Sequence, residues 1–124
     1  MESFIIVDRK STDWRFDPST FIDQLSKDWP GASIRVVTNL KRPASHEWSV
    51  SLPQSPGKTL GGFLSRSGHL VSLEGTLKDS GLFALWVRSI VPEEVPLKFF
   101  DDQHPQQFPL TQQTTLELIT EAFN

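Results

Sequence analysis

The chain of 124 residues contains no cysteine and no tyrosine. Without cysteine it cannot be a disulfide scaffold, hold zinc through thiolates or use a cysteine nucleophile. Its longest apolar run, Leu82–Val87, has six residues, whereas a membrane-spanning helix needs about 20. The N-terminus lacks the basic start of a signal peptide, because Glu2 stands there and Asp8 ends the first apolar run. We therefore expect a cytoplasmic protein that does not enter a membrane.

Basic residues are scarce in the last third of the chain. Residues 1–88 carry 11 Lys or Arg and 9 Asp or Glu, whereas residues 89–124 carry one basic and six acidic side chains. The net charge of −3 therefore arises from an acidic C-terminal segment. An acidic surface repels phosphate groups and attracts basic proteins. We expect no nucleic-acid binding and, if the chain has a macromolecular partner, a basic protein.

The stretch around which the chain is organised is Gly81–Asp102. A chain of this length predicts one domain, residues 1–124, that buries roughly two thirds of its unfolded surface. Within it, the apolar residues after Asp79 predict a helix apolar nearly all round, with Asp79 or Ser80 as its cap. Pro92 ends this helix, and Val95–Asp101 predicts a strand.

The flanking segments predict an α+β fold. Asp17 followed by Pro18 begins a helix that Pro30-Gly31 ends, and Thr114 with Glu117 matches a capping box before a terminal helix. The other predicted strands are Phe4–Val7, Ser33–Leu40, His46–Leu52, Thr59–Leu64 and His69–Glu74, and residues 102–109 are predicted to be a loop. The order is β-α-β-β-β-β-α-β-α, a mostly antiparallel sheet of five to six strands with two to three helices. Gly61-Gly62 predicts a bulge or a close backbone approach.

No catalytic motif is complete in this chain. Gly57-Lys58-Thr59 ends like a phosphate-binding loop, but Leu52 stands where that motif requires a glycine, and the residues that follow are not helical in pattern. The only histidines, His46, His69 and His104, lack the spacing of a helical metal site. We expect no metal ion and no cofactor. A cleft that held one histidine against an Asp or Glu would favour a small hydrolase instead.

Two acidic pairs, Glu93-Glu94 and Asp101-Asp102, bracket the predicted strand. Because a whole strand separates them, the pairs lie about 20 Å apart and cannot form one catalytic dyad. Each carboxylate is either a solvated loop charge or, together with others in the acidic C-terminal segment, part of a recognition surface for a basic partner.

Trp14 stands between Asp13 and Arg15 in a polar stretch. Two interpretations remain open for it. The ring either packs as a lid over the first helix or is exposed as an anchor for a protein partner, since exposed tryptophans beside charges are common at interfaces.

The C-terminal third carries a pattern that can be compared with a known family. It runs Phe83-Ala84-Leu85-Trp86-x-Arg88-x-x-Val91-Pro92, then Leu97-x-Phe99-x-Asp101, then Pro109-Leu110-Thr111 and the helix at Thr115. This pattern resembles small bacterial immunity proteins of toxin–immunity systems. The resemblance implies a single cytoplasmic α+β domain that binds and neutralises a cognate toxin without catalysis. It transfers no site residues, because such families place their toxin contacts on variable surfaces.

The leading hypothesis is therefore a non-enzymatic protein, a monomer or weak dimer, that neutralises a cognate toxin domain. If the toxin is a nuclease, its cleft is basic, and carboxylates can occupy the place of phosphates. The candidate contact residues are Glu93, Glu94, Asp101, Asp102 and Trp14. One alternative is a chaperone or adaptor for a secreted effector, which predicts a dimer with an exposed apolar groove. The other alternative is the hydrolase with a histidine–carboxylate pair.

Overall fold

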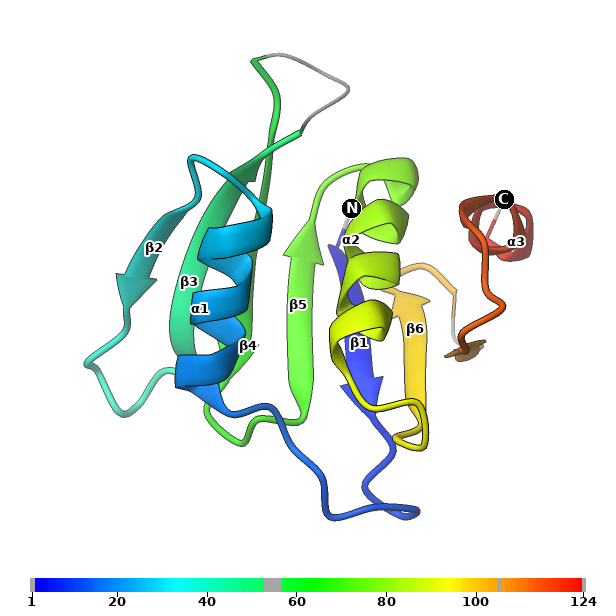
Figure 1. Cartoon of the computed structure of the whole chain (residues 1–124), viewed down its shortest axis with the longest axis horizontal. Coiled ribbons are helices and arrows are strands. Elements are labelled where there is room, and N and C mark those ends of the chain that lie inside the picture. Colours follow the sequence, from blue (N-terminus) through cyan, green and yellow to red (C-terminus); the bar gives the residue numbers. More distant parts are fainter. Residues whose placement is uncertain (1, 53–56, 105, 124) are drawn as a thin grey trace.

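The computed structural model describes residues 2–52, 57–104 and 106–123. Seven antiparallel strands form one sheet in the order β2-β3-β4-β5-β1-β6-β7, and α1 and α2 lie over one face of it (Figure 1). The strands are β1 Glu2–Val7, β2 Ser33–Val36, β3 Ala44–Ser51, β4 Thr59–Ser65, β5 Leu70–Glu74, β6 Leu97–Asp101 and β7 Phe108–Leu110. The helices are α1 Pro18–Asp28, α2 Leu77–Ile90 and α3 Leu116–Ala122. The predicted α+β class is confirmed.

Helix α1 begins and ends where the sequence predicts. The Asp17 carboxylate accepts a hydrogen bond from the Thr20 amide at 3.0 Å, and Pro18 occupies the first helical position, where a missing amide costs nothing. The chain leaves the helix at Trp29 and turns at Gly31, whose φ is +82°. Phe21 and Leu25 are buried against the sheet.

Helix α2 lies at the centre of the helical layer. Phe83, Ala84 and Val87 are fully buried, and the Phe83 ring stacks on Trp48 of β3 with centroids 5.9 Å apart. This confirms the predicted covered helix. Its start was predicted wrongly, because the cap is Thr76, whose hydroxyl accepts from the Asp79 amide at 3.1 Å. Asp79 lies in the first turn, where a negative charge favours the helix dipole.

All three helices pack on the same face of the sheet. Phe21 of α1 contacts Trp48 of β3 with ring centroids 5.3 Å apart. Helix α3 packs beside α2, and Phe123 directly after α3 contacts Phe99 of β6 at 5.3 Å. The core therefore lies between this helical layer and one sheet face.

The C-terminal region differs from the prediction in two respects. The predicted loop 102–109 contains the start of an additional strand, β7, and Pro109 is tolerated there because β7 is an edge strand that pairs only with β6. The cap of α3 is Thr115, which accepts from the Leu118 amide at 3.2 Å, so the capping box of Thr114 and Glu117 was wrong. The Thr114 hydroxyl instead accepts from the Thr111 amide at 2.8 Å.

Strand β2 is shorter than the predicted Ser33–Leu40, because it ends at Val36. The chain then turns away and is held by Arg66, from the β4–β5 turn. Its guanidinium donates hydrogen bonds to the carbonyls of Val37, Asn39 and Arg42 at 2.8, 2.9 and 2.9 Å. A side chain distant in sequence thus replaces the strand ladder.

The sheet backbone approaches Gly62 closely, as one of the two interpretations of Gly61-Gly62 predicts. A Cβ added at Gly62 would lie 2.5 Å from the Ser72 carbonyl and 2.9 Å from the Trp48 ring. The irregular register of the β3–β4 ladder lies elsewhere, between Ala44 and His46.

Replacing Gly62 by alanine should therefore destabilise the fold by about 2 kcal/mol, as overpacking of a filled core does. Gly61→Ala is the matched control, because a Cβ there would meet only the Trp48 carbonyl at 3.8 Å. Urea unfolding of both variants measures the difference. Equal stabilities for the two alanine variants would contradict this account of the strand spacing.

Candidate functional site

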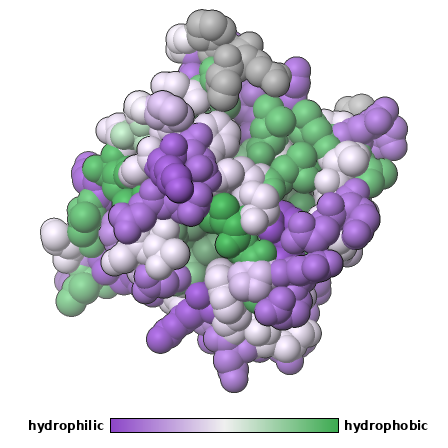
Figure 2. All heavy atoms as spheres, viewed as in Figure 1, coloured by the Kyte–Doolittle hydropathy of each residue, from purple (hydrophilic) through white to green (hydrophobic). Residues whose placement is uncertain are grey.

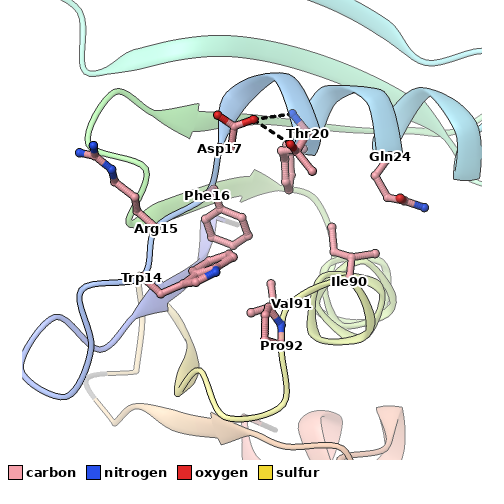
Figure 3. Close-up of a pocket in the computed structure, with 10 residues that line it drawn as sticks. Trp14, Arg15, Phe16, Asp17, Thr20, Gln24, Ile90, Val91 and Pro92 are labelled. Carbon is pink, nitrogen blue, oxygen red and sulfur yellow. Dashed lines mark hydrogen bonds between the residues drawn. The ribbon is translucent and has the colours of Figure 1, made fainter.

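An open pocket of about 310 Å³ lies where the chain enters α1 and leaves α2 (Figure 3). We call it the Trp14 pocket. Its lining is mostly apolar, with polar groups from α1 and the segment before it. The lining residues are Trp14, Arg15, Phe16, Asp17, Thr20, Phe21, Gln24, Ile90, Val91 and Pro92. On this side of the molecule hydrophobic residues form separate patches between hydrophilic ones (Figure 2).

Trp14 forms one wall of this pocket. Its side chain is half-buried and meets the ring of Phe16 edge-on, with centroids 5.0 Å apart. Phe16 is buried, and its amide donates to the Gly68 carbonyl at 2.8 Å, which fixes the segment to the β4–β5 turn. Trp14 therefore packs onto the core while one side of its ring borders the pocket, as Figure 3 shows.

Glu93 and Glu94 lie on the turn that follows the pocket wall. Both are exposed, and the turn closes with the Val95 amide donating to the Pro92 carbonyl at 3.0 Å. Pro92 lines the Trp14 pocket, whereas the two glutamates border a neighbouring hollow of about 330 Å³. Three of the five predicted contact residues are thus related to Pro92. Trp14 lines the same pocket as Pro92, and Glu93 and Glu94 follow Pro92 in the chain.

The buried side chain of Arg88 holds this turn in place. Its side chain is only 3% exposed, and its guanidinium donates to the carbonyls of Val95 at 2.7 Å, Leu110 at 3.3 Å and Val91 at 3.3 Å, and also to that of Pro92. Burial lowers the pKa of Arg88, and the nearby charges of Glu93 and Glu94 oppose that shift. The two exposed carboxylates therefore stand over a buried positive charge.

Asp101 does not contribute to an exposed acidic surface. It is 3% exposed, and its Oδ1 accepts from the amides of Gln103 at 3.0 Å and His104 at 2.7 Å. Its carboxylate therefore shapes the turn between β6 and β7, a role that the sequence interpretation missed. Asp102 is exposed, but it lies beyond the opposite end of β6 from Glu94, as the predicted separation of the two pairs requires.

The structure contains the histidine–carboxylate contact that the hydrolase alternative requires. His104 Nδ1 lies 2.9 Å from Asp101 Oδ1, and the imidazole meets the Phe123 ring with centroids 5.8 Å apart. Ser3 lies opposite Asp101 in the β1–β6 ladder, but its hydroxyl is fully buried. None of four hollows on the described chain, each of about 310 to 400 Å³, is lined by Ser3, Asp101 or His104.

The other two histidines lie apart from this pair. His46 Nδ1 contacts the Ser45 hydroxyl at 3.0 Å. His69 Nδ1 is buried and has no hydrogen-bond partner among the described residues. Burial, with added repulsion from Arg9 and Arg15, lowers the pKa of His69. Over residues 2–52, 57–104 and 106–123, no three His, Asp or Glu side chains come close enough to hold a metal ion.

The residues that resemble a phosphate-binding loop are described only in part. Residues 55 and 56 lie outside the described chain, and Lys58 is exposed. Thr59 begins strand β4, whereas a phosphate-binding loop should open a helix.

Comparisons of the chain with models of protein families, with curated proteins and with solved structures give no match. No helix in the described part of the chain has both the length and the apolar character to cross a membrane.

Replacing Arg88 by methionine should cost at least about 2 kcal/mol of stability, because buried carbonyls lose their donors. The turn with Glu93 and Glu94 should also become more mobile, which faster amide hydrogen exchange of Val95 would show. Arg35→Met is the matched control, since Arg35 is exposed and, among the described residues, its side chain bonds only Glu47. If Arg88→Met were as stable as Arg35→Met, Arg88 would not hold the turn with Glu93 and Glu94 in place.

The lowered pKa of His69 predicts a pH dependence of stability. The unfolded chain takes up a proton near the ordinary pKa of 6.5, whereas the folded chain resists it. The stabilising contribution is thus complete above about pH 6.5 and declines as the pH falls through the lowered pKa. His69→Gln should give a flatter dependence of Tm on pH between about 7 and 5. Parallel curves for variant and wild type would show that His69 is not the cause.

Proposed function

We propose that this chain is a non-enzymatic binding protein that neutralises a cognate bacterial toxin domain. The observation that carries the proposal is the arrangement around Pro92, where an apolar pocket with an aromatic wall adjoins two exposed carboxylates. The resemblance of the C-terminal third to bacterial immunity proteins supports the same function. The α+β class of the fold agrees with it.

This surface fits a lysine or arginine side chain from the partner. The aliphatic stem of such a residue packs well on apolar walls, and its cation is attracted both to the face of a tryptophan and to carboxylates. Trp14 supplies the aromatic face, and Glu93 and Glu94 supply the negative charge. If the toxin is a nuclease, its basic cleft offers side chains of this kind and steers the association.

Arg88 makes the surface suitable for binding. A turn held by side-chain bonds to its carbonyls is ordered before the partner arrives, so less conformational entropy is lost on association. The buried guanidinium also reduces the mutual repulsion of Glu93 and Glu94 without consuming their hydrogen-bonding capacity, because it bonds only carbonyls among the described residues.

A second candidate function is a chaperone or adaptor for a secreted effector. The observation that favours it is a row of half-buried apolar side chains, among them the stacked pair Phe4 and Phe100, on the sheet face that carries no helix of the described chain. A client protein requires such a surface to be free.

The test of the proposed function starts with affinity capture of the partner from the native host and identification of its toxic domain. Co-expression with wild-type protein should then restore growth of cells that produce this domain. The variant Trp14→Ala, Glu93→Lys, Glu94→Lys should lose protection, because it removes the aromatic wall and reverses both charges. Binding measured by calorimetry should weaken at least about a hundredfold.

The matched control carries Glu117→Lys and Glu121→Lys, an equal change of charge on α3, outside the pocket. It should protect like wild type. A triple variant that folds, as judged by circular dichroism, and still protects fully would refute the role of the Trp14 pocket. A captured partner that has no toxic activity would refute neutralisation itself.

A further inference from the structure

The sheet face opposite the helices can be identified from the strand register. Ser3, Ile5 and Val7 of β1 are buried on the helix side. Because side chains alternate along a strand, Glu2, Phe4 and Ile6 point to the other face. We call this second face the open face, because no helix of the described chain packs on it.

Large apolar side chains gather on the open face over four adjacent strands, β4, β5, β1 and β6. Phe4 lies opposite Phe100 and stacks on it with centroids 5.0 Å apart. On its other side Phe4 lies opposite Ser72, which in turn lies opposite Phe63, and Ile6 lies opposite Leu70. The apolar band comprises Phe4, Ile6, Phe63, Leu70 and Phe100, all half-buried. A contiguous apolar patch with a polar rim is typical of an interaction surface.

The two ends of this band carry opposite charge. At one end Glu2 lies opposite Glu74, and the Asp102 amide donates to the Glu2 carbonyl at 3.0 Å, so three exposed carboxylates lie at the ends of the neighbouring strands β5, β1 and β6. We call these three residues the acidic row. Like charges directly opposite each other destabilise a strand pair. A binding partner that supplies positive charge would remove this cost.

At the other end the charge is positive. Lys98 lies opposite Ile6, and Arg9 and Lys10 lie in the turn that comes after Asp8 at this end of β1. Asp8 offsets one of these charges, since its carboxylate lies 3.7 Å from Lys98 Nζ. Both Arg9 and Lys10 are exposed. The band therefore runs from an acidic row to a basic end along the direction of the strands.

We propose that the open face binds a second copy of this chain in a two-fold symmetric dimer of stacked sheets. A two-fold axis that lies in the interface and crosses the strands at right angles reverses the strand direction. Each acidic row then faces the basic end of the other protomer, and both sets of ion pairs form at once. An axis parallel to the strands would place acidic row on acidic row, so the charges select the first arrangement.

A second copy is the occupant that the charge pattern favours, because it matches both ends of the band. A uniformly basic partner would neutralise the acidic row but repel Lys98, Arg9 and Lys10. The apolar band spans four strands, about 14 Å from the first strand to the last at the usual strand spacing. A band of this width buries less surface than a standard protein interface does. We therefore expect a dissociation constant of the dimer in the micromolar range. The Trp14 pocket, which is built on α1 and α2, remains accessible in such a dimer.

The experiment is sedimentation equilibrium of the full chain over about 1 to 500 µM, a range that brackets the expected dissociation constant. Wild type should show a monomer–dimer equilibrium that weakens with added salt. An acid-swapped variant, Glu74→Lys with Asp102→Lys, and a base-swapped variant, Lys10→Glu with Lys98→Glu, should each self-associate at least about tenfold more weakly. An equimolar mixture of the two should regain dimerisation, because each swapped end then faces its opposite charge.

The control variant Lys27→Glu with Glu117→Lys changes two exposed charges on the helical layer and should dimerise like wild type. A wild-type chain that stays monomeric up to the highest concentration would overturn the dimer. So would swapped variants with unchanged dissociation constants, or a mixture that fails to recover. The outcome is independent of toxin neutralisation, because growth protection by the swapped variants is measured separately. Loss of protection with unchanged self-association would assign the open face to the toxin and end the dimer proposal.

Discussion

The connection from α2 to the sheet depends on the hydrogen bonds that the buried Arg88 guanidinium donates. This guanidinium joins the end of α2, the turn before β6 and the end of β7 through bonds to main-chain carbonyls. Burying a cation is costly unless its donors are satisfied. Carbonyl acceptors satisfy the two terminal nitrogens of Arg88 and leave Glu93 and Glu94 at the surface, whereas Nε has no partner among the described residues. The same side chain therefore stabilises the fold and prepares a negatively charged turn for a partner.

Much of the fold could be predicted because it follows from local chemistry. The start of α1 at Asp17-Pro18 and the alternation along β3 are properties of short segments, and both appear as predicted. Strand β7 could not be predicted, because three residues that include Pro109 form a strand only when β6 is beside them. The short β2 likewise depends on Arg66, which lies about thirty residues further along the chain.

The candidate site was predictable in composition but not in arrangement. Trp14, Glu93 and Glu94 stand out in the sequence. In the structure Trp14 lines one pocket together with Pro92, and Glu93 and Glu94, which follow Pro92 in the chain, line another hollow. Asp101 was misjudged because a carboxylate after a strand looks the same in sequence whether it faces water or caps a turn. The open face was missed because its residues belong to four strands, and only their register shows that the apolar side chains are neighbours.

The net charge of −3 does not show how the charged side chains are distributed between the two faces of the sheet. On the helical side, Glu93 and Glu94 are balanced from within by Arg88, so their repulsion is reduced before any partner binds. On the open face, Glu2 and Glu74 face each other with only the Ser72 hydroxyl donating to Glu2, at 3.1 Å. No hydrogen bond or ion pair of the described chain joins a basic side chain to the acidic row. Because like charges opposite each other destabilise a strand pair, a molecule that brought positive charge to the acidic row would relieve this repulsion on binding.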